Sequence, residues 1–167
     1  MLNGNEWQHS LPDFLITSQA LLAKSEECLC HLELFINDKD AIECLLSTLF
    51  TLSHEADALS LESIADFSRQ IRHLLALASP HTSLQGDALS TLRDCFALLA
   101  WQLELVDTDT GILLLDDSEQ LELLNTFATI VGFEDQLASA ISPTHWPTAL
   151  TLKSEVAPES IAASRIA

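Results

Sequence analysis

The chain has 167 residues, 48% of them hydrophobic, and its 25 acidic and 7 basic residues give a net charge of −18 at pH 7. This length suffices for one hydrophobic core, and no run of about 18 apolar residues indicates a membrane span. A charge of this sign repels the phosphates of nucleic acids and anionic lipids, so we expect neither as a partner. The first residues lack the basic and apolar regions of a secretory signal, so we expect a cytoplasmic protein with reduced cysteines.

The first predicted helix follows Ser10, which is placed to act as its N-cap, with Pro12 in the first turn. Asn37 and Asp38 are expected to end it. Apolar residues recur along it at near-heptad spacing, which is typical of a helix with one buried face. They are Phe14, Leu15, Leu21, Leu22, Cys28, Leu29, Leu32 and Phe35.

Two further helices are predicted on either side of a turn that starts at Ala58. Asp38 or Asp40 is placed to cap the second helix, which runs to that turn. Ser60 is placed to cap the third helix, and the serine-proline pair at 79–80 is expected to end it.

Two further helices are predicted, of which only the last is short. A fourth opens at the glycine-aspartate pair at 86–87 and runs to Leu105, and a loop over 107–117 follows. A fifth, with its cap at 118–119, runs over about 121–130.

Amphipathic helices with short connections predict an all-α protein, an antiparallel four-helix bundle with a short fifth helix and an irregular C-terminal tail. From Ser142 onward the apolar period is lost and three of the five prolines occur. We therefore expect a helical bundle over residues 10–141 and a loosely ordered tail or linker over 142–167.

The sequence has no catalytic or phosphate-binding motif, so we expect no enzyme, no metal and no cofactor. The four cysteines lie in helical stretches, where cysteine acts as a small hydrophobic residue. Cys28, Cys30 and His31 are neighbours, but successive helical residues point about 100° apart and do not converge on one ion. The run from Asp107 to Gly111 lacks the spacing of a calcium loop and predicts a polar turn.

The segment from Leu45 to Leu75, LLSTLFTLSHEADALSLESIADFSRQIRHLL, resembles the signature of histidine phosphotransfer (HPt) domains. In that family the pattern runs L-F-R-x-x-H-T-L-K-G-x-A-x-x-L-G-L-x-x-L-A. The chain supplies Thr51-Leu52, Ala56, Leu59-Ser60-Leu61 and Ala65 at the matching positions. The resemblance is closest to the HPt-like N-terminal modules of chemosensory proteins that control type IV pili and twitching motility, some of which lack the histidine.

In this register the phosphoacceptor histidine of the family falls on Phe50, its lysine on Ser53 and its glycine on His54. Phenylalanine has no nucleophilic nitrogen, so the resemblance implies an HPt-like scaffold that carries no phosphoryl group. A register with the phosphoacceptor on His54 instead places Asp57 at the position of the family's lysine. A carboxylate at that position would repel phosphate. Phe50 as an ordinary core residue of an unrelated bundle is the remaining alternative.

A helical bundle of this kind can still present a docking face. We expect it to bind a protein partner, namely a receiver, a histidine kinase or a scaffold protein. This requires Phe50 or its neighbours to lie on an accessible side of the second helix. The predicted partner-binding residues are Phe50, Ser47, Ser53, His54 and Asp57.

A secondary cationic patch is predicted on the third helix, where Arg69, Arg72 and His73 share one face. It is placed to pair with acidic residues of a partner, or internally with Asp66, Glu62 or the first helix.

The sequence thus favours a non-catalytic signalling adaptor of HPt-like form. Two alternatives remain: an acidic protein that mimics nucleic acid and inhibits a DNA- or RNA-binding protein, and an active HPt domain that uses His54. Carboxylates in rows at phosphate-like spacing would indicate the mimic, and an apolar patch around Phe50 would indicate the adaptor.

Overall fold

The computed structural model describes residues 4–79 and 83–132, and the predicted tail at 142–167 lies outside them. Within these ranges the protein is all-α, with five helices and no strand. The helices are α1 (Gly4–Leu34), α2 (Lys39–Ala58), α3 (Glu62–Ala78), α4 (Asp87–Leu105) and α5 (Ser118–Val131).

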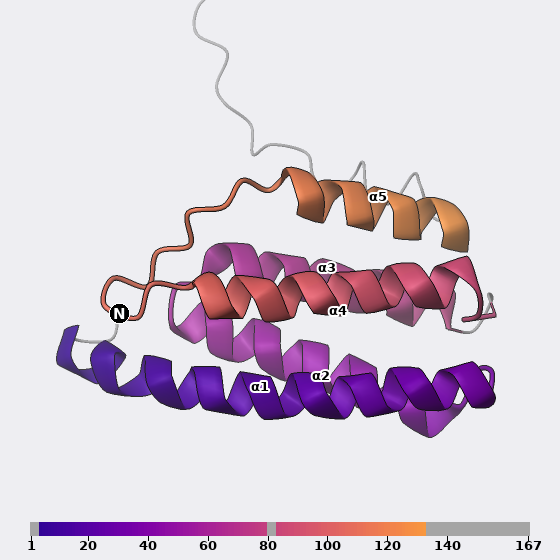
Figure 1. Cartoon of the computed structure of the whole chain (residues 1–167), viewed down its shortest axis with the longest axis horizontal. Helices are drawn as coiled ribbons and strands as arrows, with labels where there is room; N and C mark the ends of the chain where they lie inside the picture. Colours follow the sequence, from indigo (N-terminus) through magenta and orange to yellow (C-terminus); the bar gives the residue numbers. More distant parts are fainter. Residues whose placement is uncertain (1–3, 80–82, 133–167) are drawn as a thin grey trace, which may run out of the picture.

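The helices lie side by side around one apolar core (Figure 1). α1 packs on α2 and α4, and α3 also packs on both α2 and α4, so the first four helices enclose the core. α5 lies across α3 and α4. No helix in the described ranges is long and apolar enough to cross a membrane.

α1 begins earlier than the sequence predicted. It starts at Gly4, so Ser10 lies inside the helix and does not cap it, and Pro12 is also internal. The six residues before Ser10 contain no helix-breaking proline, so the sequence allows the helix to extend back to Gly4. The helix also ends earlier than predicted, at Leu34, so Phe35 lies in the turn and is 58% exposed.

The turn between α1 and α2 is held by two polar side chains. Asn37 has a φ of 57°, in the left-handed region that asparagine tolerates, and its Oδ1 accepts a hydrogen bond from the backbone N–H of Leu84 at 2.9 Å. Asp38 is the N-cap of α2, as one of the two predicted candidates, and its Oδ1 accepts from the N–H of Ala41 at 2.9 Å.

The turn between α2 and α3 corrects the prediction that Ser60 caps α3. Ser60 has a φ of 60° and belongs to the end of α2, where the N–H of Leu61 reaches back to the carbonyl of Ala56 at 2.9 Å. α3 then starts at Glu62 without a side-chain cap. A residue in the left-handed conformation that closes one helix cannot also hold the extended conformation of the next N-cap.

The predicted start and end of α4 are confirmed, and α5 is close to its predicted range. A polar chain fixes the start of α5 on the start of α3. The amide of Gln120 donates to Ser63 Oγ at 2.9 Å, and Ser63 Oγ donates to Asp117 Oδ1 at 3.1 Å.

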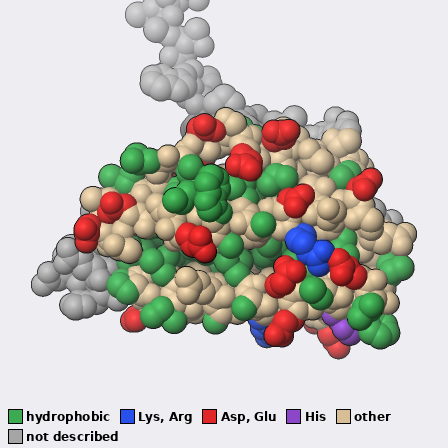
Figure 2. Space-filling model, viewed as in Figure 1, with side chains coloured by type: hydrophobic (Ala, Val, Ile, Leu, Met, Phe, Trp, Pro, Cys, Tyr) green, Lys and Arg blue, Asp and Glu red, His purple; other side chains and the backbone are tan. Residues whose placement is uncertain are grey.

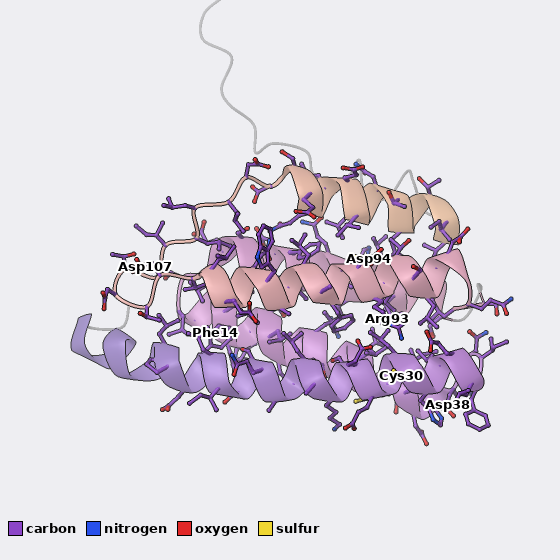
Figure 3. All side chains as sticks on the ribbon, viewed as in Figure 1. Phe14, Cys30, Asp38, Arg93, Asp94 and Asp107 are labelled. Atoms are coloured by element: carbon purple, nitrogen blue, oxygen red, sulfur yellow. The ribbon has the colours of Figure 1, made fainter. Side chains whose placement is uncertain are left out.

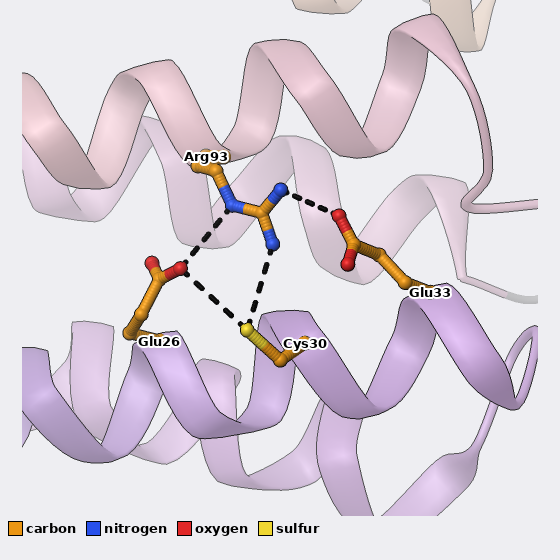
Figure 4. A network of polar contacts seen from close by, with 4 residues as sticks. All are labelled: Glu26, Cys30, Glu33 and Arg93. Carbon is orange, nitrogen blue, oxygen red and sulfur yellow. Dashed lines mark hydrogen bonds and ion pairs between the residues drawn. The ribbon is translucent and has the colours of Figure 1, made fainter.

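α1 and α4 are joined by ion pairs around Arg93, which points from α4 toward α1 (Figure 3). Its guanidinium lies 2.6 Å from Glu33 Oε1 and 3.4 Å from Glu26 Oε1 (Figure 4). These carboxylates raise the pKa of Arg93, with the Glu33 hydrogen bond as the largest cause. The cation therefore stays charged and holds two helices that are far apart in sequence.

Candidate functional site

One side of α2 is open to solvent while the other forms part of the core. Leu45, Leu49, Leu52 and Ala56 are fully buried. The residues three and four positions apart on the opposite side are all exposed. They are Ser47, Phe50, His54 and Asp57.

The exposure that the adaptor hypothesis requires is confirmed. Phe50 is 54% exposed, and Ser47 and His54 are exposed beside it. Phe50 is therefore not an ordinary core residue. Full burial of a phenylalanine side chain contributes about 1.5–3 kcal/mol, and because about half of Phe50 is exposed, it supplies only part of this stabilisation to the fold.

Ser53 is a predicted partner-binding residue that lies on the buried side of α2, away from the other four. It is 7% exposed and its Oγ donates to the carbonyl of Phe50 at 2.9 Å. Position 53 lies four residues after Leu49 and three before Ala56, both in the core, so the helical spacing turns its side chain toward the interior. A partner cannot contact it without opening the helix pair.

α3 adds two arginines to this surface. The guanidinium carbon of Arg72 lies 5.3 Å from the ring centroid of Phe50, in the range of a cation–π contact. The rings of Phe50 and His54 are parallel to within 2°, with centroids 6.1 Å apart. Arg69 pairs with Asp66 on its own helix and lies 3.7 Å from Asp57 on α2.

We call this surface the Phe50 face. It consists of Ser47, Phe50, His54 and Asp57 of α2 with Arg69 and Arg72 of α3. Two groups of residues that the sequence suggested separately therefore meet on one side of the molecule. Their juxtaposition could have been found from the hairpin register, because Phe50 and Arg72 are each 11 residues from Leu61 in the turn.

The two arginines differ in their pairing. Arg69 is engaged internally with Asp57 and Asp66, although at half-exposed side chains such pairs contribute little to stability. Glu62, another predicted internal partner, forms no ion pair with either arginine in the described ranges. No carboxylate of the described residues pairs with Arg72. His73, the third member of the predicted patch, is exposed next to it.

The loop after α4 is a polar turn, as its sequence predicted. Asp107 Oδ1 accepts from the N–H groups of Asp109 and Thr110 at 2.9 and 2.7 Å, and the backbone hydrogen bond from Thr110 lowers the pKa of Asp107 most. In the part of the chain that the structure describes, no three histidine, cysteine or acidic side chains are grouped so as to hold a metal ion.

A second group of exposed hydrophobic side chains lies on α4 and the loop that follows it. Figure 2 shows hydrophobic side chains gathered between α4 and the start of α5, with acidic side chains scattered around them. Trp101 is 46% exposed, Leu105 44%, and Leu114 in the loop 90%. This group has no cationic neighbour comparable to Arg72 among the described ion pairs and ring contacts, and it provides a matched control for the Phe50 face.

Comparison with known proteins gives no relative: no family model, no curated protein and no solved structure matches the chain.

Proposed function

We propose that the chain is a non-catalytic signalling adaptor, a degenerate HPt-like antiparallel four-helix bundle that docks a receiver, a histidine kinase or a scaffold through the Phe50 face. The observation that carries this proposal is the exposure of Phe50, 54%, at the position where the HPt pattern has its phosphoacceptor. A phosphoacceptor must project into solvent so that a partner can reach it. Phe50 occupies this exposed position but has no nucleophilic nitrogen that could accept a phosphoryl group.

The turn after α2 supports the same register. Ser60 stands where the HPt pattern has glycine, and its φ of 60° is the left-handed conformation that glycine adopts most easily. The backbone at position 60 therefore has the conformation that the glycine of the pattern favours, although the residue here is serine.

The surroundings of Phe50 indicate the chemistry of the partner. Arg72 is a cation without a carboxylate partner among the described residues, although the chain carries 25 acidic residues. A partner that presents an apolar pocket to Phe50 and a carboxylate to Arg72 gains both burial of the ring and a charge-assisted hydrogen bond. On a protein of net charge −18, this combination favours a partner that offers a carboxylate at the Phe50 face.

On the face drawn in Figure 2, the distribution of charge gives no support to nucleic-acid mimicry. Figure 2 shows the carboxylates of the visible face as separate groups with hydrophobic side chains between them, without continuous rows. Two of these carboxylates, Glu26 and Glu33, are engaged by Arg93 (Figure 4).

An assay of phosphoryl transfer distinguishes the adaptor hypothesis from that of an active HPt domain. The purified chain is incubated with phosphorylated receivers and histidine kinases from its own organism, and acid-labile phosphate is measured alongside binding by calorimetry. We expect binding of at least one of these proteins without label. Label that is absent from a His54→Gln variant would show that His54 is the phosphoacceptor, and absence of binding to every receiver, kinase and scaffold tested would contradict the adaptor.

A further inference from the structure

Two cysteines face each other across the seam between α1 and α2. Cys28 and Cys44 are each eight residues from Ile36 in the turn that joins the two helices, so the hairpin register places them at the same level. Both are partly exposed, and both thiols are free. The helices that carry them pack on each other, both cysteines line the same pocket, and the neighbouring Cys44 thiol is, after burial, one cause of the raised pKa of Cys28.

A pocket opens to solvent over this pair. It has a volume of about 390 Å³, and both cysteines lie in its wall together with Lys24, His31 and Asp38. His31 Nε2 lies 3.7 Å from Asp38 Oδ2 at one side. A small reagent therefore reaches the thiols without any opening of the core.

The other two cysteines are placed differently. Cys30 is two residues after Cys28, so its side chain points about 200° away around α1. Its Sγ lies 3.7 Å from Glu26 Oε1 and 3.8 Å from the guanidinium of Arg93 on α4 (Figure 4). Cys95 is fully buried.

We propose that Cys28 and Cys44 form a redox modification site, in which a low-molecular-weight disulfide such as oxidised glutathione converts the two thiols into an intramolecular disulfide that links α1 to α2. One cysteine thiolate attacks the S–S bond of glutathione disulfide and releases one glutathione thiolate. The second cysteine thiolate attacks the resulting mixed disulfide and releases the other. Two protein thiols are oxidised and one glutathione disulfide is reduced to two thiols.

The geometry of packed helices permits this bond. A disulfide needs Cα atoms about 4.4–6.8 Å apart. Helix axes about 8–10 Å apart, with Cα atoms about 2.3 Å from each axis, bring residues that face each other at the seam close to that range.

The environment of the Cys28 thiol determines the rate of the reaction. Burial, followed by the neighbouring Cys44 thiol, raises the pKa of Cys28 to about 12. Because the thiolate is the attacking species, we expect slow oxidation, over minutes to hours, and a reaction that is faster in mildly alkaline buffer.

The test uses the full chain with oxidised glutathione at about pH 8, followed by tryptic mapping with and without reductant. Cys28 and Cys30 share the tryptic peptide 25–39, and Cys44 lies in peptide 40–69. The two cysteines are therefore separated with a Cys30→Ser variant, which keeps the seam pair, and a Cys28→Ser variant, which keeps Cys30 as the matched control.

We expect the wild type and Cys30→Ser to yield the two peptides joined within one chain, with a mass lower by two hydrogens than the reduced pair, and to return to free thiols on reduction. Cys28→Ser should give no such link. The proposal is overturned if Cys28 and Cys44 stay free or carry glutathione separately, if the link joins two chains, or if Cys28→Ser links Cys30 to Cys44 equally well.

Discussion

At the scale of single residues, the Phe50 face shows how an apolar and a charged side chain specify a partner together. Phe50 alone would bind any apolar pocket, and Arg72 alone would pair with any exposed carboxylate. Because the guanidinium lies 5.3 Å from the ring centroid, a partner that buries the ring also desolvates the cation. Burial without a carboxylate would leave a charge unpaired, which excludes purely apolar surfaces.

Asp38 gives a prediction on pH dependence. The backbone hydrogen bond from Ala41 is the largest cause that lowers the pKa of Asp38 below its ordinary 3.8. A lowered folded-state pKa stabilises the protein above the unfolded value, and this contribution is lost as the pH falls through the folded value. We expect Asp38→Ala to lower the melting temperature at pH 7, with the difference from wild type shrinking as the pH falls through the folded-state pKa of Asp38.

Asp38→Asn is the control, since asparagine caps a helix without charge. Its melting temperature at pH 7 should be close to that of the wild type, and this temperature should change less with pH than the wild-type value does. A difference between wild type and Asp38→Ala that persists unchanged in acid would show that the carboxylate is not what caps α2.

At the scale of helices, the turn between α2 and α3 carries a second prediction. Ser60 holds a φ of 60°, which costs a residue with a Cβ about 1–2 kcal/mol, whereas glycine adopts it without that penalty but loses more chain entropy on folding. We expect Ser60→Gly to raise the free energy of unfolding by about 1 kcal/mol, measured by urea denaturation. Ser47→Gly, in the middle of α2, should lower it by about 0.5–1 kcal/mol. Equal losses in both variants would show that position 60 is not left-handed in solution.

The helices also show what the sequence can and cannot predict. Apolar spacing and strong end signals predicted five helices, Asp38 was one of the two candidates for the cap of α2, and the start of α4 at 87 was placed correctly. The start of α1 and the role of Ser60 were wrong, because serine favours several helix-end conformations and the choice depends on the whole turn.

The candidate site was predicted only in part. The spacing that indicates the exposed residues of α2 also turns Ser53 toward the core, but Ser53 was assigned to the site from its place in the HPt-like pattern. The contact of Arg72 with Phe50 joins two helices. It depends on how their surfaces meet, which periodicity within either helix does not contain.

At the scale of the whole molecule, the net charge of −18 opposes compaction, and the described ion pairs use only a minority of the carboxylates. Self-repulsion between exposed charges is screened over about 10 Å at 0.1 M salt. We therefore expect the melting temperature to rise modestly between low and moderate concentrations of sodium chloride. A flat dependence would indicate that the carboxylates are neutralised by bound cations.

The central claim is that the Phe50 face is the docking surface, and the most direct test compares two exposed aromatics. The dissociation constant of a receiver or kinase that binds the wild type is measured for Phe50→Asp and for Trp101→Asp, whose side chains are 54% and 46% exposed in the wild type. Each measurement is made at low and at moderate salt, and circular dichroism confirms that both variants are folded.

We expect Phe50→Asp to weaken binding by more than tenfold, about 1.4 kcal/mol, and Trp101→Asp to leave it within about twofold, because only the first charge falls in the desolvated centre of the contact. Wild-type affinity should fall by less than about tenfold between 50 and 200 mM salt, whereas a mimic of nucleic acid that matches a basic groove at many phosphate sites would lose about 10³-fold or more. Unchanged binding by Phe50→Asp, together with a steep loss in salt, would contradict the account.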